Sequence, residues 1–555
     1  MARRQTVSDR TDVIAERPSW PAEAAERYRA RGYWRGRTFG GRLRDWAADW
    51  GSREAVADSR VRLTYGELDA AADRMAGGLR RLGIRRGDRV VVQFPNRADF
   101  LVVWFGLVRL GAVPVHAQPG HRASELIHLA RTSEAAALVL PERLARFDHR
   151  ALGEAVRAEA PSVRHVVIAG EPLPGQVPLA DVAAGPALPA DESADQGDAG
   201  DTALLLLSGG TTGAPKLIPR THDDYAYNAD AAAEICGLGP DSVYLAALPI
   251  AFNFTMSCPG VLGVLSAGGR VVVAPSGDPG SAFPLIEREG VTITAINPPL
   301  APIWIDEAAA AHDLSTLEIV QIGSARLADD VARRVEPALG ARLQQVFGMA
   351  EGLLCLTRLD DDNELRCTTQ GRPVSPDDEI RVVDGTSGDA DRPVTPGEPG
   401  ELLTRGPYTL RGYYRAAEHN ARAFTPDGWY RTGDLVRRLP SGHLVVVGRA
   451  KDQINRGGEK IAATEVEGHL LAHPAVGGAA LVGAPDPRWG ERSVAFLLPR
   501  AGTVAPARGD LLAFLQERGV AAYKHPDQVE VLEEFPLTAV GKIDKNVLRA
   551  RLAER

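Results

Sequence analysis

The chain has 555 residues, of which 44% are hydrophobic and 25% are charged, a composition that is ordinary for a folded globular protein. This length exceeds the usual size of one hydrophobic core, so two or more domains are expected. The net charge of -8 argues against a nucleic-acid-binding protein, which would need a strongly basic surface, although a local site for anions is compatible with it.

The cysteines and the N-terminal sequence indicate the compartment. The chain contains neither a CxxC pair nor a dense cysteine framework, which favours a reduced, cytoplasmic protein; the four cysteines are Cys236, Cys258, Cys355 and Cys367. Arg3 and Arg4 are not followed by an apolar stretch, so no signal peptide is predicted. The most apolar segment, residues 100–115, contains Arg109 and is too short to cross a bilayer, so no membrane role is predicted.

The first two hundred residues predict an N-terminal arm followed by an α/β unit. Residues 1–50 are rich in Arg, Trp and Ala, and we expect them to form an arm and a helix packed on the body. Strand-like runs then alternate with helical patterns, which predicts βαβ units and a largely parallel sheet between residues 55 and 179. The expected strands are residues 89–94, 136–140 and 165–168, the expected helix is residues 65–82, and residues 100–115 are expected to form a core helix followed by a strand.

The rest of the chain predicts a second α/β unit and two smaller parts. Residues 183–201 contain few large apolar side chains and predict a loose acidic loop. In the second unit, which ends near residue 345, the expected strands are residues 203–207, 271–274, 293–297 and 319–322. Residues 370–448 consist of short segments between turns and predict a small β subdomain. The last hundred residues predict a compact α+β lid with helices at 463–472 and 508–517 and a strand near 478–482.

A glycine-rich loop lies between the apolar run at 203–207 and the helix expected to begin near residue 221. Residues 208–216 read SGGTTGAPK. Glycines let backbone N–H groups point at an anion, and hydroxyls and a lysine add donors and charge. The loop is therefore predicted to hold nucleotide phosphates with Ser208, Gly209, Gly210, Thr211, Thr212, Gly213 and Lys216. It is not a Walker A loop, because no Gly-Lys-Ser/Thr triplet ends it; taken alone, it could also be a surface turn.

Four further motifs follow this loop in order. They read QVFGMAE at 345–351, YRTGD at 430–434, GRAKDQINRGGEK at 448–460 and PLTAVGK at 536–542. Together the five motifs resemble the adenylate-forming (AMP-binding) superfamily, which includes acyl-CoA synthetases, luciferases and peptide-synthetase adenylation domains, over roughly residues 35–550. Residues 218–225, 462–467 and 522–524 are similar to the stand-alone aryl-acid adenylating enzymes, which supply benzoate-type starters for siderophores and related peptides.

The resemblance implies a fold and a reaction. The fold is α/β: a large N-terminal domain of α/β subdomains plus a small β subdomain, residues 1–450, and a small mobile α+β lid, residues 451–555. Lys451 corresponds to the hinge. The reaction joins an aryl carboxylate to ATP, forming aryl-AMP and pyrophosphate, with Mg²⁺ as the metal. The lid would then rotate and present residues near 450 for thioester formation.

Adenylation brings a carboxylate to a polyanion, so catalysis requires positioning and cations where charge develops on the phosphoryl oxygens. Lys542 is the predicted catalytic cation, placed by the resemblance at the carboxylate and the α-phosphate. Glu351 is predicted to be catalytic as the residue that holds Mg²⁺ shared with the ATP phosphates. Asp434 would accept the ribose hydroxyls, and Arg449 would reinforce the ribose or phosphate contact.

The remaining nucleotide contacts concern adenine. The end of the strand at 319–322 is expected to supply the backbone edge along which adenine lies, with the next motif forming the other wall. The residues are Gly323, Ser324 and Ala325 on the first side and Val346, Phe347 and Gly348 on the second.

Residues 248–260 (LPIAFNFTMSCPG) align with the aryl-acid pocket signature. Asn253 corresponds to the asparagine that serves the ortho substituent, and Phe254 could pack flat on the ring. Two further positions, those of Cys258 and Leu354, bear on selectivity. In this family, cysteine and leucine at these positions accompany salicylate, whereas serine and valine accompany 2,3-dihydroxybenzoate. A bulkier, less polar wall gives a second hydroxyl neither a partner nor room. Gly323 completes the predicted substrate residues.

Departures from the family pattern leave the acid open. Phe252 stands where the family usually has histidine, and Thr255 replaces a usual proline. The first choice is salicylate, and the alternatives are 2,3-dihydroxybenzoate, 3-hydroxyanthranilate, 6-methylsalicylate and 3-hydroxypicolinate. Asn253 can donate or accept a hydrogen bond, so the sequence does not separate an ortho hydroxyl from an ortho amine.

The resemblance also implies an acceptor for the activated acid. We find no phosphopantetheine attachment motif, so a phosphopantetheinylated aryl carrier protein is expected to act in trans. Coenzyme A is the alternative, since an aryl-CoA ligase would share every ATP motif. A regulatory nucleotide-binding protein without turnover is a further alternative, and the presence of Lys542, Glu351 and Asp434 argues against it.

Overall fold

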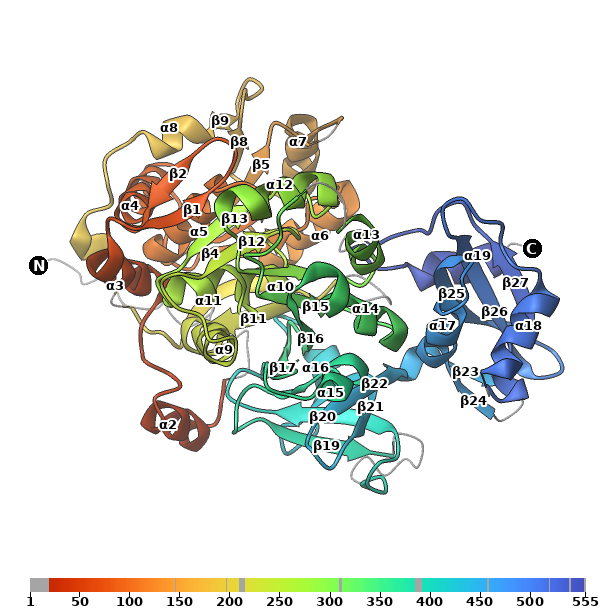
Figure 1. Cartoon of the computed structure of the whole chain (residues 1–555). Helices are drawn as coiled ribbons and strands as arrows, with labels where there is room; N and C mark the ends of the chain where they lie inside the picture. Colours follow the sequence, from red (N-terminus) through yellow and green to blue (C-terminus); the bar gives the residue numbers. More distant parts are fainter. Residues whose placement is uncertain are drawn as a thin grey trace, which may run out of the picture.

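The computed structural model describes residues 19–144, 146–195, 197–208, 215–308, 312–384, 392–456, 459–518, 520–538 and 541–553. Two lobes are visible in Figure 1: a large lobe, which runs from the first described residues to strand β22 (Leu444–Arg449), and a small lobe in blue, which holds the residues from 453 onward. None of the described helices is both long and apolar enough to cross a membrane.

A seven-stranded sheet forms one layer of the large lobe. Its order is β11 (Leu217–Thr221), β10 (Thr202–Leu207), β4 (Val113–Ala117), β3 (Arg89–Gln93), β5 (Ala137–Pro141), β8 (His165–Ala169) and β9 (Val177–Pro178). The pairs are parallel except β10–β11, as expected from βαβ units. Helices α4 (Tyr65–Arg81), α5 (Asp99–Leu110), α6 (Ala123–Ser133) and α7 (His149–Glu159) connect its strands or cover it. These bounds confirm the expected strands and helix to within one or two residues.

A nine-stranded sheet forms the second layer. Its order is β18 (Arg372–Pro373), β17 (Gly352–Leu356), β16 (Arg342–Met349), β15 (Ile319–Gly323), β14 (Ile293–Ile296), β12 (Val243–Ala246), β13 (Arg270–Val273), β1 (Glu54–Ala57) and β2 (Arg62–Thr64). Its helices are α9 (His222–Ile235), α10 (Asn253–Ser257), α11 (Gly260–Ser266), α12 (Pro279–Glu289), α13 (Leu300–Glu307), α14 (Asp329–Leu339) and α15 (Asn363–Thr368). Two expectations are wrong. β1 does not join the first α/β unit but pairs with β13 of the second, Val56 opposite Val271. β10, expected in the second unit, pairs instead with β4 of the seven-stranded sheet, Leu205 opposite Val115.

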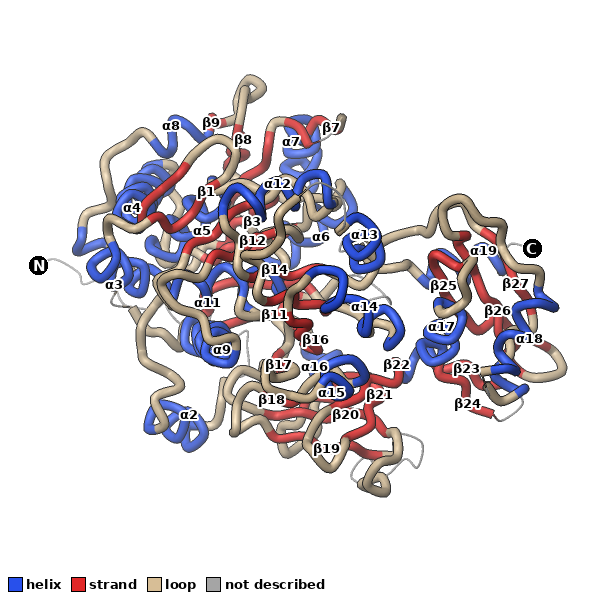
Figure 2. Tube along the Cα trace, viewed as in Figure 1, coloured by secondary structure: helices blue, strands red, loops and turns tan. Residues whose placement is uncertain are grey.

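Both sheets are covered on both faces. In β12, Tyr244 and Ala246 belong to one buried cluster while Val243 and Leu245 belong to another, because successive side chains point to opposite faces of a strand. The first cluster also contains residues of the seven-stranded sheet and of α4, α5, α9 and α11, so it lies between the two sheets. The second is covered by α12, α13 and α14 (Figure 2). Strands buried on both faces read as continuous apolar runs, which is why the sequence revealed them.

The predicted small β subdomain is a four-stranded antiparallel sheet of β19 (Glu379–Val383), β20 (Gly400–Arg405), β21 (Tyr430–Arg438) and β22, with helix α16 (Ala417–Ala423) beside it. The N-terminal arm contains α2 (Ala22–Ala30) and leads into α3 (Phe39–Trp50). This arm packs on the β subdomain: Arg31 pairs with Asp377 at 2.8 Å, and the Trp34 indole donates to the Pro407 carbonyl at 3.1 Å.

The small lobe has its own sheet and core. The strands are β23 (Gln453–Arg456), β24 (Glu459–Ala462), β25 (Val476–Asp486), β26 (Gly490–Pro499) and β27 (Gln528–Val531), and the helices are α17 (Ala463–Leu471), α18 (Arg508–Glu517) and α19 (Lys545–Ala553). Helices α17 and α18 enclose one buried cluster and α19 covers another on the opposite face of the sheet. The expected α+β lid is confirmed as a fold, although β23, β24, β26, β27 and α19 were not predicted.

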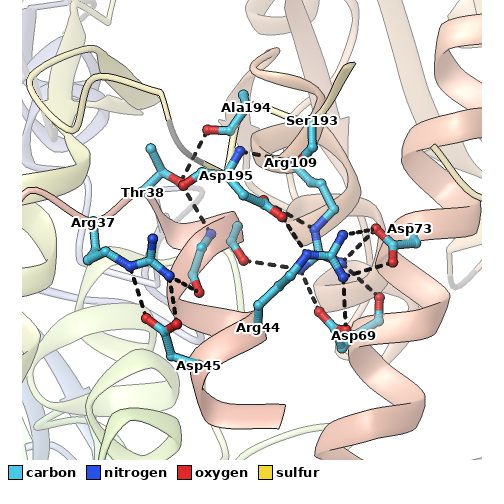
Figure 3. Close-up of polar contacts among 12 residues, drawn as sticks. Arg37, Thr38, Arg44, Asp45, Asp69, Asp73, Arg109, Ser193, Ala194 and Asp195 are labelled. Atoms are coloured by element: carbon cyan, nitrogen blue, oxygen red, sulfur yellow. Dashed lines mark hydrogen bonds and ion pairs between the residues drawn. The ribbon is translucent and has the colours of Figure 1, made fainter. Parts of the chain in front are cut away.

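A buried arginine ties the segment before residue 201 to the helices of the large lobe (Figure 3). Arg109, fully buried on the apolar helix α5, binds Asp69 at 2.6 Å, Asp73 at 3.0 Å and Asp195 at 3.4 Å. Arg44 of α3 joins the same carboxylates. The expectation of a loose acidic loop is therefore wrong for this part of the segment, because Asp195 neutralises a charge that cannot reach water.

Candidate active site

A cleft of about 2310 Å³ lies where the two lobes meet, and residues of both lobes line it. It collects most of the side chains that the sequence motifs singled out. The predicted residues in its wall are Ser208, Lys216, Asn253, Phe254, Cys258, Ser324, Ala325, Val346, Phe347, Gly348, Glu351, Leu354, Asp434, Arg449 and Lys542. Segments more than three hundred residues apart in the chain thus contribute to one cavity.

The glycine-rich loop is described only at its two ends. Ser208 and Lys216 close the β10–β11 hairpin: the Ser208 N–H donates to the Lys216 carbonyl at 2.9 Å, and the Lys216 N–H donates to Ser208 Oγ at 3.0 Å. His128 of α6 contacts the Pro215 carbonyl at 2.7 Å. The predicted phosphate ligands Gly209, Gly210, Thr211, Thr212 and Gly213 lie outside the described residues. Ser208, Pro215 and Lys216 line the cleft, and the phosphate contacts remain predictions.

The ends of β15 and β16 form the predicted adenine edge. The two strands are parallel neighbours, with Gly323 opposite Val346. Gly323 does not line the cleft itself; a Cβ on it would lie 2.7 Å from the Val346 carbonyl and 3.1 Å from Cζ of Phe254, so no larger residue fits there. Ser324 follows with φ at 74°, a left-handed conformation that is rare for serine and turns the chain sharply into the cleft.

The predicted ribose site is built by two adjacent strands. Asp434 of β21 faces Arg449 of β22, and the guanidinium Nε lies 2.8 Å from the carboxylate Oδ1. Asp434 is only 4% exposed, so the ion pair holds it in one orientation. The Asp434 charge raises the pKa of Arg449, which stays protonated. The two residues act as one unit, and Arg449 positions the carboxylate that ribose hydroxyls would meet.

Glu351 lies in the turn between β16 and β17 and is 9% exposed. The Tyr413 hydroxyl donates to its Oε1 at 2.8 Å, and the Tyr413 and Tyr430 hydroxyls are 2.8 Å apart. Burial raises the pKa of Glu351, whereas the Tyr413 bond opposes that rise. Tyr413 was not predicted as a site residue, because it lies outside every motif. Tyr430 begins the YRTGD motif, but the motif predicted a role only for Asp434.

Metal chemistry at this site would depend on ATP. Among the described residues, no group of three or more His, Cys, Asp or Glu side chains could hold a metal ion. A single carboxylate, that of Glu351, is suited to Mg²⁺ that also binds nucleotide phosphates and water, since Mg²⁺ in such sites takes one or two protein carboxylates.

The small lobe brings Lys542 to the cleft wall on a turn. The Lys542 N–H donates to Thr538 Oγ1 at 3.1 Å, and the Thr538 N–H donates to the Lys542 carbonyl at 2.7 Å. Gly541 has φ at 76°, and a Cβ there would lie 3.5 Å from the Asn297 side chain of the large lobe. This lobe orientation therefore places the turn that carries the predicted catalytic lysine beside Asn297, the residue after β14.

The connection between the lobes is short. Lys451 lies in a single 3₁₀ turn, Ala450–Asp452, between β22 and β23; its side chain lies outside the described structure. Asp452 binds Arg549 of α19 at 2.8 Å, and Arg518 reaches across to Asp330 of α14 at 3.2 Å. Such a turn can absorb a change of backbone angles, and an exposed ion pair of this kind costs little to break.

The predicted aryl pocket is formed by α10 and the residues that follow it. The Tyr225 hydroxyl donates to Asn253 Oδ1 at 3.0 Å, and Asn253 Nδ2 lies 3.9 Å from Cys258 Sγ. Burial raises the pKa of Cys258 to about 12, so its thiol is neutral. Gly348 makes room for Leu354, because a Cβ there would come within 2.9 Å of the leucine Cδ1. Phe252 also lines the cleft.

Two residues that support this pocket were not predicted. Asn228 of α9 donates to the Ser257 carbonyl at 2.5 Å and to Ser257 Oγ at 2.8 Å, which anchors α10. His116 lies 2.9 Å from the Ala251 carbonyl through Nδ1 and accepts the Trp104 indole N–H at Nε2. Burial lowers the pKa of His116 to about 4, so the ring is neutral and Nδ1 is the donor. Their contacts span elements far apart in sequence, and no motif signals them.

Comparisons with known proteins show which families, sequences and structures the chain resembles. The profile of the family described as AMP-binding enzyme matches residues 43–414, and that of the AMP-binding enzyme C-terminal domain matches residues 465–542. The chain is 54% identical over 538 residues to the 2,3-dihydroxybenzoate-AMP ligase of Bacillus subtilis (strain 168), covering 97% of each.

Two further similarities cover nearly the whole chain. A Streptomyces protein named salicylyl-CoA synthase / salicylate adenylyltransferase is 52% identical over 537 residues, or 96% of each chain. The apo structure of MbtA from Mycobacterium smegmatis is 47% identical and superposes with a TM-score of 0.75, covering 98% of this chain and 100% of the other.

Proposed function

The chain belongs to the family of AMP-binding enzymes, and we propose that it activates an ortho-substituted aryl carboxylic acid with ATP, releasing pyrophosphate and forming an aryl-AMP. The observation that carries the proposal is the shared cleft. Asn253, Phe254 and Cys258 line the same cavity as Lys542, Glu351 and Asp434. Two relatives that are 54% and 52% identical to this chain are named for aryl-acid adenylation.

The proposed first step is a displacement at phosphorus. A carboxylate oxygen of the acid attacks the α-phosphorus, an O–P bond forms, and the bond to the pyrophosphate oxygen breaks. Lys542 would contact the carboxylate and the α-phosphate and stabilise the charge that builds on the phosphoryl oxygens. Mg²⁺ held by Glu351 and the ATP phosphates would neutralise the leaving pyrophosphate. Asp434, fixed by Arg449, would orient the ribose.

We propose that the two lobes correspond to the two domains, residues 1–450 and 451–555, with Lys451 as the hinge. The short 3₁₀ turn between β22 and β23 supports this boundary. In the described orientation the small lobe presents Lys542, which suits adenylation. Rotation about the turn would withdraw Lys542 and present residues 448–460 for the second step.

The second proposed step transfers the aryl group to a thiol. A pantetheine thiolate attacks the carbonyl carbon of aryl-AMP and a C–S bond forms. The bond between that carbon and the phosphate oxygen breaks, and AMP leaves with the oxygen. A phosphopantetheinylated aryl carrier protein acting in trans is the first choice, and coenzyme A is the alternative. Four free cysteines, all buried, suit a reducing compartment, and we place the enzyme in the cytoplasm.

The test is ATP–pyrophosphate exchange across a panel of acids. The panel contains salicylate, 2,3-dihydroxybenzoate, 3-hydroxyanthranilate, 6-methylsalicylate, 3-hydroxypicolinate, benzoate and phenylalanine. The proposal predicts strong exchange with at least one ortho-substituted aryl acid and little with benzoate or phenylalanine; the reverse order would contradict it. Offering the activated acid to carrier protein and to coenzyme A in parallel then identifies the acceptor.

A further inference from the structure

The hydrogen-bond polarity of the pocket is determined by a residue behind its wall. Tyr225 lies in the first turn of α9 and is fully buried, and its hydroxyl donates to Oδ1 of Asn253 at 3.0 Å. Burial raises the pKa of Tyr225, so the phenol keeps its proton and remains a donor. An amide has one acceptor oxygen and one donor nitrogen. With the oxygen engaged by Tyr225, the Nδ2 group is the part of Asn253 directed elsewhere.

The Nδ2 group has a weak partner. It lies 3.9 Å from Sγ of Cys258, and a thiol sulfur is a poor acceptor. Burial keeps this thiol neutral, so the sulfur does not gain the strength of a thiolate. Asn253 and Cys258 both line the cleft. The pocket therefore offers an N–H donor to a ligand. A ligand oxygen would accept a stronger hydrogen bond from it than the Cys258 sulfur does.

Tyr225 is itself held in place by charged and polar contacts. The Arg220 guanidinium lies 4.9 Å from the centre of the Tyr225 ring, and it binds Asp224 at 2.6 Å and the Ala350 carbonyl at 3.0 Å. Thr221 caps the same helix through Asp224. A cation over the ring strengthens the phenol as a donor, so the orientation of the Asn253 amide is maintained from β11 and α9.

The ortho substituent of a bound acid would meet this donor. An ortho hydroxyl donates its hydrogen to the neighbouring carboxylate and presents its oxygen lone pairs outward, where they can accept from Nδ2. An ortho amine also donates one hydrogen to the carboxylate, but its second N–H points outward, and its lone pair is delocalised into the ring. The outward N–H of the amine and the Nδ2 group, both donors, would then face each other in a buried site. Neither would have an acceptor, which lowers the affinity for the ortho-amino acid.

We propose that Tyr225 is a specificity-determining positioning residue, which orients the Asn253 amide so that the pocket selects acids with a hydrogen-bond acceptor at the ortho position and rejects ortho amines. This inference rests on the proposed function. It retains salicylate, 2,3-dihydroxybenzoate, 6-methylsalicylate and 3-hydroxypicolinate as candidates and removes 3-hydroxyanthranilate. The identity of Asn253 alone does not make this distinction.

The test compares matched acids that differ in one ortho group: salicylate with anthranilate, and 6-methylsalicylate with 2-amino-6-methylbenzoate. The readout is the ratio of kcat/KM values in ATP–pyrophosphate exchange. For the wild type, in the pair that is exchanged faster, the kcat/KM of the hydroxy acid should exceed that of the amino acid at least about tenfold. Tyr225→Phe keeps the ring but frees the amide to turn, so the ratio should fall about tenfold. Asn253→Asp places an acceptor at the site and should favour the ortho-amino acid, whatever its effect on absolute rates.

A matched control removes a different buried phenol. Tyr244 of β12 is fully buried, its hydroxyl has no hydrogen-bond partner within the described structure, and it does not line the cleft; Tyr244→Phe should leave the ratio unchanged. Equal use of hydroxy and amino acids by the wild type, or an unchanged ratio in Tyr225→Phe, would overturn the inference and leave the proposed function standing. Absence of exchange with every ortho-substituted acid would overturn both.

Discussion

The Tyr413 hydroxyl donates a hydrogen bond of 2.8 Å to Oε1 of Glu351 and so connects the β subdomain side of the cleft to the predicted metal ligand. Tyr430 extends this contact through its own hydroxyl, 2.8 Å from that of Tyr413. A buried carboxylate is costly unless it is hydrogen-bonded, and this pair of phenols supports the charged form that a metal ion would require. Glu351 is thus held in one geometry before any ligand arrives.

Replacing Tyr413 with phenylalanine tests that role. A hydrogen bond to a charged group contributes about 1.5–3 kcal/mol, so we expect the Mg²⁺ concentration for half-maximal ATP–pyrophosphate exchange to rise roughly tenfold or more. Tyr430→Phe, which removes a hydroxyl bonded to Tyr413 rather than to Glu351, should have a smaller effect. An unchanged Mg²⁺ requirement in Tyr413→Phe would show that the contact does not prepare Glu351 for metal.

The double variant Cys258→Ser plus Leu354→Val should shift preference toward 2,3-dihydroxybenzoate. A serine hydroxyl gives a second ring hydroxyl a partner, and valine is shorter than the leucine that now packs beside Gly348. We expect the kcat/KM for 2,3-dihydroxybenzoate relative to salicylate to rise about 10- to 100-fold. Cys355→Ser changes a buried cysteine that does not line the cleft and serves as control. An unchanged ratio would remove Cys258 and Leu354 from the selectivity argument.

Arg109→Met should destabilise the protein more than a surface arginine variant does. Arg109 is fully buried, and its removal leaves Asp69, Asp73 and Asp195 with one cation fewer. Breaking a buried pair in this way costs about 3–5 kcal/mol of unfolding free energy. Arg131→Met, which breaks a pair with Glu159 whose two side chains are 56% and 57% exposed, should cost about 1 kcal/mol or less. Similar losses in urea unfolding would contradict the account of the buried cluster.

Asp378 should make stability depend on pH. Burial raises its pKa to about 8, Tyr408 donates to its Oδ2, and its Oδ1 has no partner in the described structure. Between its ordinary pKa and pH 8 the unfolded chain has released this proton and the folded protein has not. The stability that Asp378 contributes is therefore present at low pH and lost as pH rises toward 8.

Asp378→Asn removes this titration. Relative to the wild type, the variant should gain roughly 1 kcal/mol of unfolding free energy per pH unit between pH 5 and pH 7, measured by urea unfolding. Asp241→Asn, at a side chain that is fully exposed, should show no such trend. A difference between Asp378→Asn and the wild type that stays constant with pH would mean that Asp378 is charged in the folded protein.

The strands and helices of the large lobe could be predicted because they carry strong patterns. Strands such as β3 and β5 are buried on both faces and read as apolar runs, and α4 begins with a capping box at Thr64 and Glu67. Pairings between distant segments could not: nothing in residues 54–57 indicates that β1 joins β13.

The candidate site was predictable where its residues belong to contiguous motifs. Lys542, Asp434 and Glu351 meet in one cleft as the motif order implied. Tyr413 and the bond from Tyr225 to Asn253 were not predictable, because each depends on how two elements pack. Arg109 was recognised only as an interruption of an apolar segment; its three carboxylate partners lie on α4 and in the segment before residue 201.

The central claim is that this cleft forms an acyl adenylate with Lys542 as the cation at the reacting atoms. The most direct measurement is single-turnover formation of aryl-AMP from ATP and the preferred acid by wild type and Lys542→Ala, together with ATP affinity. We predict a loss of at least about 100-fold in the rate with ATP binding largely retained. Lys524→Ala, which breaks an ion pair with Glu465, should keep the rate. A near-wild-type rate in Lys542→Ala would contradict the account.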